Sequence, residues 1–185
     1  MSSKLKVDRI HHVAYRCKDA KETVEWYVEN LNMDFVLAIA EDQVPSTKEP
    51  DPYMHVFLDA GSDNVLAFFE LPTKAPMDRD RNTPEWVQHI AFRVKDRETL
   101  LAYRDKLEEN GIEVLGVTDH SLFHSIYFFD PNGHRLELSC PDPEEEAKLK
   151  RLDEVKWEML EEWSQTKRAP KHAAWLHDAE FNPSN

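Results

Sequence analysis

Apolar and polar residues alternate in two short segments that resemble each other. The first segment is Ile10-His-His-Val-Ala-Tyr-Arg-Cys17, and the second is Trp86-Val-Gln-His-Ile-Ala-Phe-Arg-Val94. A period of two is typical of β-strands, because successive side chains point to opposite faces of a sheet. One face of each predicted strand therefore carries a histidine, an alanine and an arginine: His12, Ala14 and Arg16 in the first, and His89, Ala91 and Arg93 in the second.

A helix is expected after each of these strands. Asp19 is placed to cap a helix over residues 20–31, and Asp96 a helix over residues 97–110. A carboxylate at this position accepts hydrogen bonds from the free N–H groups of the first helical turn. Three more strands are then predicted in each half, at residues 34–40, 53–59 and 65–71, and at residues 112–118, 124–129 and 135–139.

The repeat predicts an α+β fold made of two βαβββ modules, at about residues 7–71 and 86–141. One such module is too small to bury both of its faces, so we expect both to form a single domain, residues 7–141, as a sheet cupped around one site. Proline-rich segments at residues 71–85 and 41–52 read as a linker and as a loop bordering a pocket. Residues 142–185 form a tail, which begins with an amphipathic helix over 144–165. We expect this tail, including Trp175, Leu176 and Phe181, to pack on its own domain or on a dimer partner.

Each half also carries a glutamate late in its sequence. Glu70 lies in Phe68-Phe-Glu-Leu, and Glu137 lies in Arg135-Leu-Glu-Leu. Two imidazoles and one carboxylate with open coordination positions are favoured by non-haem Fe(II), although Mn, Zn, Ni and Co accept the same ligands. We therefore predict a divalent metal held by His12, His89 and Glu137. Glu70 is expected as a fourth ligand or a general base, with a solvated rim position as the alternative, because an unpaired carboxylate on an apolar strand is costly to bury.

Charge and cysteine content exclude several classes of function. The chain of 185 residues has 36 acidic and 23 basic residues and a net charge of -13, which argues against binding to nucleic acid or anionic membranes. The two cysteines, Cys17 and Cys140, indicate neither a disulfide framework nor a cysteine zinc site. The N-terminus lacks the apolar segment of a signal peptide and no stretch approaches a membrane span, so we expect a cytoplasmic protein.

The paired modules resemble the vicinal oxygen chelate superfamily. This group includes glyoxalase I, methylmalonyl-CoA epimerase, fosfomycin-resistance thiol transferases and extradiol ring-cleaving dioxygenases. The resemblance covers roughly Val7 to Pro141 and leaves the tail outside. It implies one metal bound by the first and last strands of each module, where His12, Glu70, His89 and Glu137 stand.

One segment resembles the extradiol dioxygenase signature in particular. It runs from Thr118 to Glu137 and contains His120, Ile126-Tyr127, the turn Asp130-Pro-Asn-Gly133 and the glutamate. The resemblance implies that Tyr127 hydrogen-bonds the substrate and that His120 lies at the substrate or just behind it. A similar Ser-Ile-Tyr-Phe and Asp-Pro-x-Gly-His pattern also occurs in fosfomycin-resistance-like members. Extradiol enzymes generally carry a catalytic histidine late in the first module. This chain has Glu70 there, and His55, one strand earlier, could replace it or point outward.

The leading hypothesis is an Fe(II)-dependent dioxygenase that cleaves a catechol-like ring with O2 and uses Tyr127, His120 and Glu70 to handle protons. The main alternative is a lyase or isomerase of glyoxalase or epimerase type. A fosfomycin-type thiol transferase and a metal-free drug-binding protein are less favoured. We expect a small-molecule substrate and a homodimer. Arg16 and Arg93 are expected either to bind anionic substrate groups or to pair with carboxylates.

Overall fold

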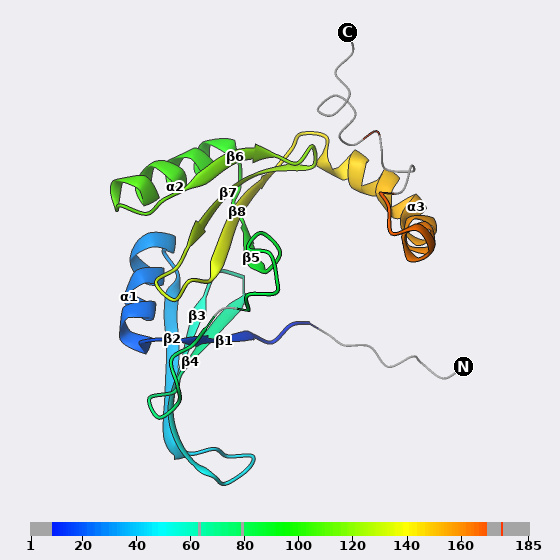
Figure 1. Ribbon diagram of the computed structural model, residues 1–185. Coiled ribbons are helices and arrows are strands. Elements are labelled where there is room, and N and C mark those ends of the chain that lie inside the picture. The colour runs from blue at the N-terminus through cyan, green and yellow to red at the C-terminus, as the bar shows by residue number, and fades with distance from the viewer. Residues whose placement is uncertain (1–8, 63, 79, 170–174, 176–185) are drawn as a thin grey trace, which may run out of the picture. The chain divides into compact units, whose positions relative to one another are not determined.

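The computed structural model describes residues 9–62, 64–78, 80–169 and 175 (Figure 1). Its elements follow the predicted order, which confirms the α+β fold of two strand–helix–three-strand modules with a C-terminal helix. In chain order they are β1 (Val13–Cys17), α1 (Ala20–Leu31), β2 (Asp34–Gln43), β3 (Pro50–Asp59), β4 (Val65–Glu70), β5 (His89–Arg93), α2 (Arg97–Glu109), β6 (Leu115–Asp119), β7 (Phe123–Phe129), β8 (Arg135–Pro141) and α3 (Glu145–Thr166).

The strands form two four-stranded sheets with the same topology. The orders are β1-β4-β3-β2 and β5-β8-β7-β6, and β1 runs parallel to β4 while β2, β3 and β4 are antiparallel. By backbone proximity the described residues divide into two compact units: those within 9–90, 109–112 and 129–136, and those within 91–108, 113–128 and 137–175. The domain bounds 7–141 and 142–185 remain predictions.

Helix α1 forms where the sequence predicts it. The side chain of Asp19 accepts a hydrogen bond from the N–H of Glu22 at 2.8 Å, and Asn32 ends the helix in the left-handed conformation with φ 54°. Tyr27 of α1 is fully buried, with its ring 5.2 Å from that of Phe68 on β4. One face of the first sheet is therefore covered by α1.

Strand register decides which side chains of the first sheet share a face. Cys17 is paired with Glu70, and Glu70 with Met54, so these residues lie on the face that Phe68 presents to α1. Arg16 is paired with Phe69, and Phe69 with His55. Because successive side chains of a strand point to opposite faces, this second set lies on the face turned away from α1.

The turn between β7 and β8 belongs to the first unit, where a buried polar network fixes it to α1. The hydroxyl of Tyr27 donates to Asp130 Oδ2 at 3.1 Å, and the same carboxylate accepts the backbone N–H groups of Asn132 and His134 at 2.9 and 2.8 Å. Asn132 donates in turn to the hydroxyl of Thr23 at 3.0 Å. Burial, together with the neighbouring Asp130, raises the pKa of Tyr27 well above its usual value, so the phenol stays protonated as a donor.

Replacing Asp130 with alanine is expected to lower the free energy of unfolding by about 2–4 kcal/mol, because buried donors that lose their acceptor cost about 1–3 kcal/mol each. Tyr27→Phe removes one hydroxyl and leaves Asp130 with its backbone donors, so about 1 kcal/mol is expected. Urea denaturation followed by circular dichroism measures both values. Equal losses in the two variants would show that Asp130 does not organise the network.

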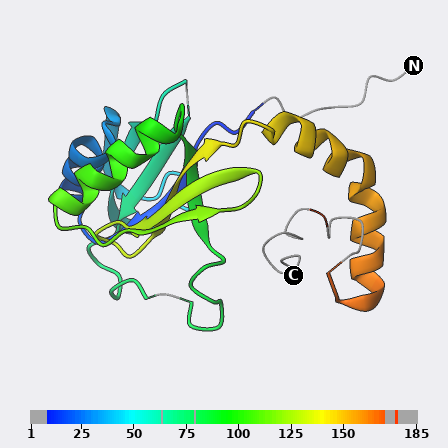
Figure 2. The same cartoon turned by 90° about the horizontal axis from the view of Figure 1, so that it is seen from above.

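Helix α3 follows β8 as one continuous helix (Figure 2). Its first turns are held by Glu145, which pairs with Arg93 at 3.0 Å, and by Lys148, which donates to the carbonyl of Ser121 at 2.7 Å. No residue of α3 is buried, and its exposed apolar side chains are Leu149, Trp157, Leu160 and Trp163. The packing expected for Leu176 and Phe181 lies outside the described residues.

Within the described part of the chain, no helix combines the length and apolar character that a membrane crossing requires.

Candidate functional site

Five rings form a continuous row on the face of the first sheet that is turned away from α1. The ring of His55 is stacked on Phe69, with centroids 3.6 Å apart and planes 17° apart, and it lies 4.1 Å from the ring of Phe57. His12 lies 5.5 Å from Phe57 and 6.0 Å from His55. Tyr53 extends the row, 5.5 Å from Phe69. We call these residues, His12, Tyr53, His55, Phe57 and Phe69, the aromatic face.

His55 is the polar residue at the centre of the aromatic face. Its side chain is only 8% exposed, and its Nε2 atom is buried without a hydrogen-bond partner among the described residues. Burial, and secondarily the nearby His12, keep the pKa of His55 below its usual value. The sequence alone left the direction of this side chain open. The pairing of His55 with Phe69 shows that the side chain lies on the same face of the sheet as His12.

Glu70 lies on a different face of the first sheet from His12. Its partners in the register, Cys17 and Met54, belong to the face that carries α1, whereas His12 contacts the aromatic face. The Oε2 atom of Glu70 accepts a hydrogen bond from the N–H of Ala20 at 2.7 Å. Glu70 therefore caps α1, where a negative charge is favourable at a helix N-terminus. Its role as a fourth ligand or general base stays a prediction, which this position does not favour.

Glu70 and Glu137 occupy similar tetrapeptides, but they are not at equivalent positions in the two modules. When the modules are aligned by their turns, Glu70 lies three residues beyond the counterpart of Glu137. The turns that precede the last strands are closed by equivalent hydrogen bonds, from Ala60 to Asn64 and from Asp130 to His134, each 3.0 Å long. Glu137 follows His134 by three positions, as Ala67 follows Asn64. Ala67, not Glu70, is therefore the counterpart of Glu137 in the first module.

The second unit gathers three of the predicted site residues on one face of its sheet. The hydroxyl of Ser125 donates to Glu137 Oε1, and both side chains are buried. Tyr127 lies two residues after Ser125 on β7 and shares its face. The hydroxyl of Tyr127 lies 2.7 Å from His120 Nε2. A carboxylate, a phenol and an imidazole thus stand together.

His12 and His89 belong to the first unit, and both are exposed. The Nδ1 atom of His12 lies 2.8 Å from that of His11, and the Nδ1 atom of His89 lies 3.2 Å from the carbonyl oxygen of Val87. Two imidazoles and the Glu137 carboxylate fit a divalent metal by donor type. Within residues 9–169, excluding 63 and 79, and residue 175, the structure contains no cluster of three or more histidine, cysteine or acidic side chains able to hold a metal ion. The metal set therefore stays a prediction.

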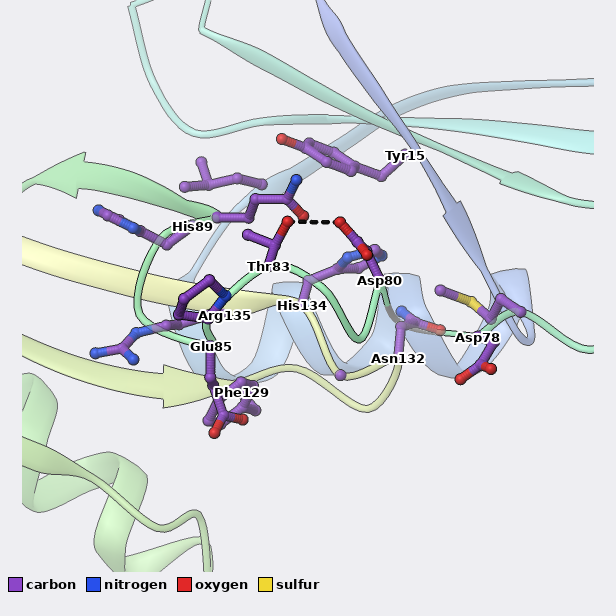
Figure 3. A pocket seen from close by; sticks show the side chains of 15 residues that line it. Tyr15, Asp78, Asp80, Thr83, Glu85, His89, Phe129, Asn132, His134 and Arg135 are labelled. Carbon is purple, nitrogen blue, oxygen red and sulfur yellow. Dashed lines mark hydrogen bonds between the residues drawn. The ribbon is translucent and has the colours of Figure 1, made fainter.

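His89 also lines a cavity within the first unit (Figure 3). Tyr15 and His134 face this cavity, and the segment between the modules supplies Asp78, Asp80 and Glu85. The sequence described that segment only as a linker, whereas here it forms a wall. Arg135 and His134 line the cavity as well, so its wall holds both acidic and basic side chains.

Comparison with known proteins decides the family. A sequence model of the Glyoxalase/Bleomycin resistance protein/Dioxygenase superfamily matches residues 9–138. The chain belongs to this superfamily. That assignment confirms the resemblance seen in the sequence, because this is the group with the paired-module fold described above.

Two relatives of the superfamily are similar over 88 residues each. MhqA of Bacillus subtilis (strain 168), which is named as a ring-cleaving dioxygenase, is 31% identical over 48% of this chain and 28% of its own length. The metapyrocatechase of Pseudomonas sp. (strain CF600) is 33% identical over 45% of this chain and 29% of its own length. The chain thus matches less than a third of the length of either relative.

Among solved structures, the fosfomycin resistance protein FosX from Listeria monocytogenes has a similar fold. The TM-score is 0.55 at 19% identity, over 76% of this chain and 98% of that protein. At this level of identity the similarity supports the superfamily fold alone.

Proposed function

We propose that this chain is an Fe(II)-dependent extradiol-type dioxygenase that cleaves a catechol-like aromatic ring with O2. Its metal ligands would be His12, His89 and Glu137. The observation that carries the proposal is the hydrogen-bonded pair of His120 and Tyr127 on the same face as Glu137. This group lies in the segment whose sequence resembles the extradiol signature, and both relatives described above are named for ring-cleavage chemistry or as a metapyrocatechase.

The chain's own residues suit the binding of an aromatic ring. The aromatic face offers rings for edge-to-face or stacked contacts, which add about 0.5–1.5 kcal/mol per pair to the gain from burial. Leu37 and Ile39 are exposed on β2, and Ile39 is the register partner of His55. The apolar face of a planar aromatic ring would cover these side chains and remove them from water.

Proton handling falls to three residues. When bound, the divalent ion would polarise a substrate oxygen and lower its pKa. The hydroxyl of Tyr127 would donate a hydrogen bond to that oxygen, and His120 would hold the hydroxyl in place through the 2.7 Å contact. His55 would accept a proton at Nε2, the atom that lacks a partner among the described residues. Glu70 takes no part, because it caps α1.

A lyase or isomerase of the glyoxalase or epimerase type is the second candidate. The superfamily includes glyoxalases, and the buried Glu137 carboxylate could move a proton next to a chelated substrate. The position of Glu70 weakens this candidate, since it removes the second carboxylate such a reaction was expected to use. A fosfomycin-type thiol transferase has no support beyond a similar fold in a fosfomycin resistance protein.

Oxygen consumption separates the two candidates. The full chain is loaded anaerobically with Fe(II) and then given a panel of catechols in an oxygen electrode, with the absorbance of ring-cleavage products recorded in parallel. We expect one O2 consumed per catechol cleaved. No uptake with any catechol, combined with turnover of a 2-oxoaldehyde and thiol mixture, would contradict the dioxygenase proposal and favour the alternative.

We also propose that the chain forms a homodimer. Support comes from α3, which has no buried residue and presents Leu149, Leu160 and Trp163 to solvent. Large exposed apolar surfaces commonly mark interfaces. Light scattering on the eluting protein is expected to give about twice the chain mass of 21.7 kDa. A monomer at micromolar concentration would contradict this.

A further inference from the structure

Arg16 and Arg93 hold matching positions in the two halves of the chain, but their surroundings differ. Arg93 forms an ion pair with Glu145 at 3.0 Å. Arg16 forms no ion pair with any residue that the structure describes. Its NH2 group donates to the carbonyl of Ala75 at 2.6 Å, and its Nε atom is buried without a hydrogen-bond partner in the described part of the chain.

Arg16 stands on the same side of the first sheet as the aromatic face. It is the register partner of Phe69, whose ring is stacked on His55. His12 precedes Arg16 by four residues, so the two Cα atoms lie about 13 Å apart along the strand direction, at roughly 3.3 Å per residue. A proposed metal ligand and an arginine thus lie on one face of the sheet, beside the aromatic rings of β3 and β4.

The acidic character of the chain makes it informative that no carboxylate among the described residues pairs with Arg16. Acidic residues outnumber basic ones by 36 to 23, and the equivalent arginine is paired. The buried Nε–H group of Arg16 is costly to leave without an acceptor. Its fork of N–H donors matches a carboxylate, which it can bind through two parallel hydrogen bonds. A partner from outside the chain would complete this site.

We propose that Arg16 binds a carboxylate on the substrate, so the preferred substrate is an aromatic ring that carries an acidic side chain. The ring would lie on the aromatic face, between Arg16 and His12. This inference rests on the proposed function in one respect, namely that the aromatic ring is a catechol.

Two probes that differ only in the charged group test the inference. 3,4-Dihydroxyphenylacetate carries a carboxylate where 4-methylcatechol carries hydrogen. Binding of each probe to the Fe(II)-loaded full chain is measured by anaerobic calorimetry, and kcat/KM is measured separately with O2. The variants are Arg16→Met, which removes the guanidinium, and Arg93→Met, which removes the equivalent, paired arginine. Arg16→Lys keeps the positive charge but lacks the paired N–H donors of the guanidinium. It replaces Arg16→Met in the test if that variant fails to fold.

The wild-type chain is expected to bind the carboxylate probe about 10–100-fold more tightly than the methyl probe, as hydrogen bonds to charged groups allow. Arg16→Met should remove this preference, Arg16→Lys should keep part of it, and Arg93→Met should leave it unchanged. Equal binding of both probes by the wild type, or an equal loss for both probes in Arg16→Met, would overturn the inference. A preference that depends on Arg16 without any O2 uptake would support the inference and contradict the dioxygenase proposal.

Discussion

Replacing Glu137 with glutamine is expected to abolish turnover and to weaken metal binding by more than about 100-fold, while replacing Glu70 with glutamine leaves both intact. Glu137 is the only carboxylate proposed as a ligand, and even residues that merely support a ligand cost 10–100-fold in metal affinity when changed. Glu70 lies on the α1 side of the first sheet, where its carboxylate accepts the N–H of Ala20 at 2.7 Å.

The two variants are matched because each exchanges one carboxylate for an amide of the same shape. Glu70→Gln keeps an oxygen that can accept from Ala20 and loses only the charge at the helix N-terminus, so the loss of stability should stay below about 1 kcal/mol. Metal per chain is measured by elemental analysis after anaerobic loading and gel filtration. If Glu70→Gln loses the metal and Glu137→Gln retains it, then Glu70 and not Glu137 is the carboxylate ligand.

The second large effect is expected at His55. Changing His55 to alanine should lower kcat by about 10²–10⁴-fold, the usual contribution of a positioned acid or base, with metal content unchanged and substrate Kd raised by no more than about tenfold, the effect of one lost ring contact. The reason is geometric: Nε2 is buried without a partner among the described residues, on the side of the sheet that His12 contacts. Steady-state oxygen uptake measures kcat, and calorimetry measures Kd.

Rescue distinguishes a proton-handling role from a structural one. The alanine variant leaves space beside Phe69 for an added imidazole, which should restore part of the lost activity. His124→Ala serves as the control. That residue precedes Ser125 on β7 and points to the other face, 4.0 Å from Asp119. Lost metal in His55→Ala, or an absence of rescue in a variant that unfolds like the wild type, would count against proton transfer at His55.

Much of the fold follows from local sequence patterns. Alternating residues mark β1 and β5, and Asp19 caps α1 as predicted. The turn Asp130-Pro-Asn-Gly also forms between β7 and β8. These features depend on neighbouring residues, so they can be derived before any long-range contact is known.

Features that depend on pairing between strands could not be derived in this way. Glu70 and Glu137 occupy similar tetrapeptides, yet the register places Glu70 opposite Cys17 on the α1 side. The direction of His55 likewise required its pairing with Phe69. Arg16 and Arg93 look equivalent in the sequence, and long-range contacts separate them: Arg93 pairs with Glu145 of α3, whereas Arg16 donates to the carbonyl of Ala75.

The most direct test of the central claim is the number of Fe(II) ions held per chain by the wild type and by the variants His12→Ala, His89→Ala and Glu137→Ala, measured anaerobically at matched protein concentration. The account predicts one tightly held ion in the wild type and its loss in each of the three variants, with folding preserved. A variant that keeps one ion per chain with wild-type affinity would contradict the proposed ligand set.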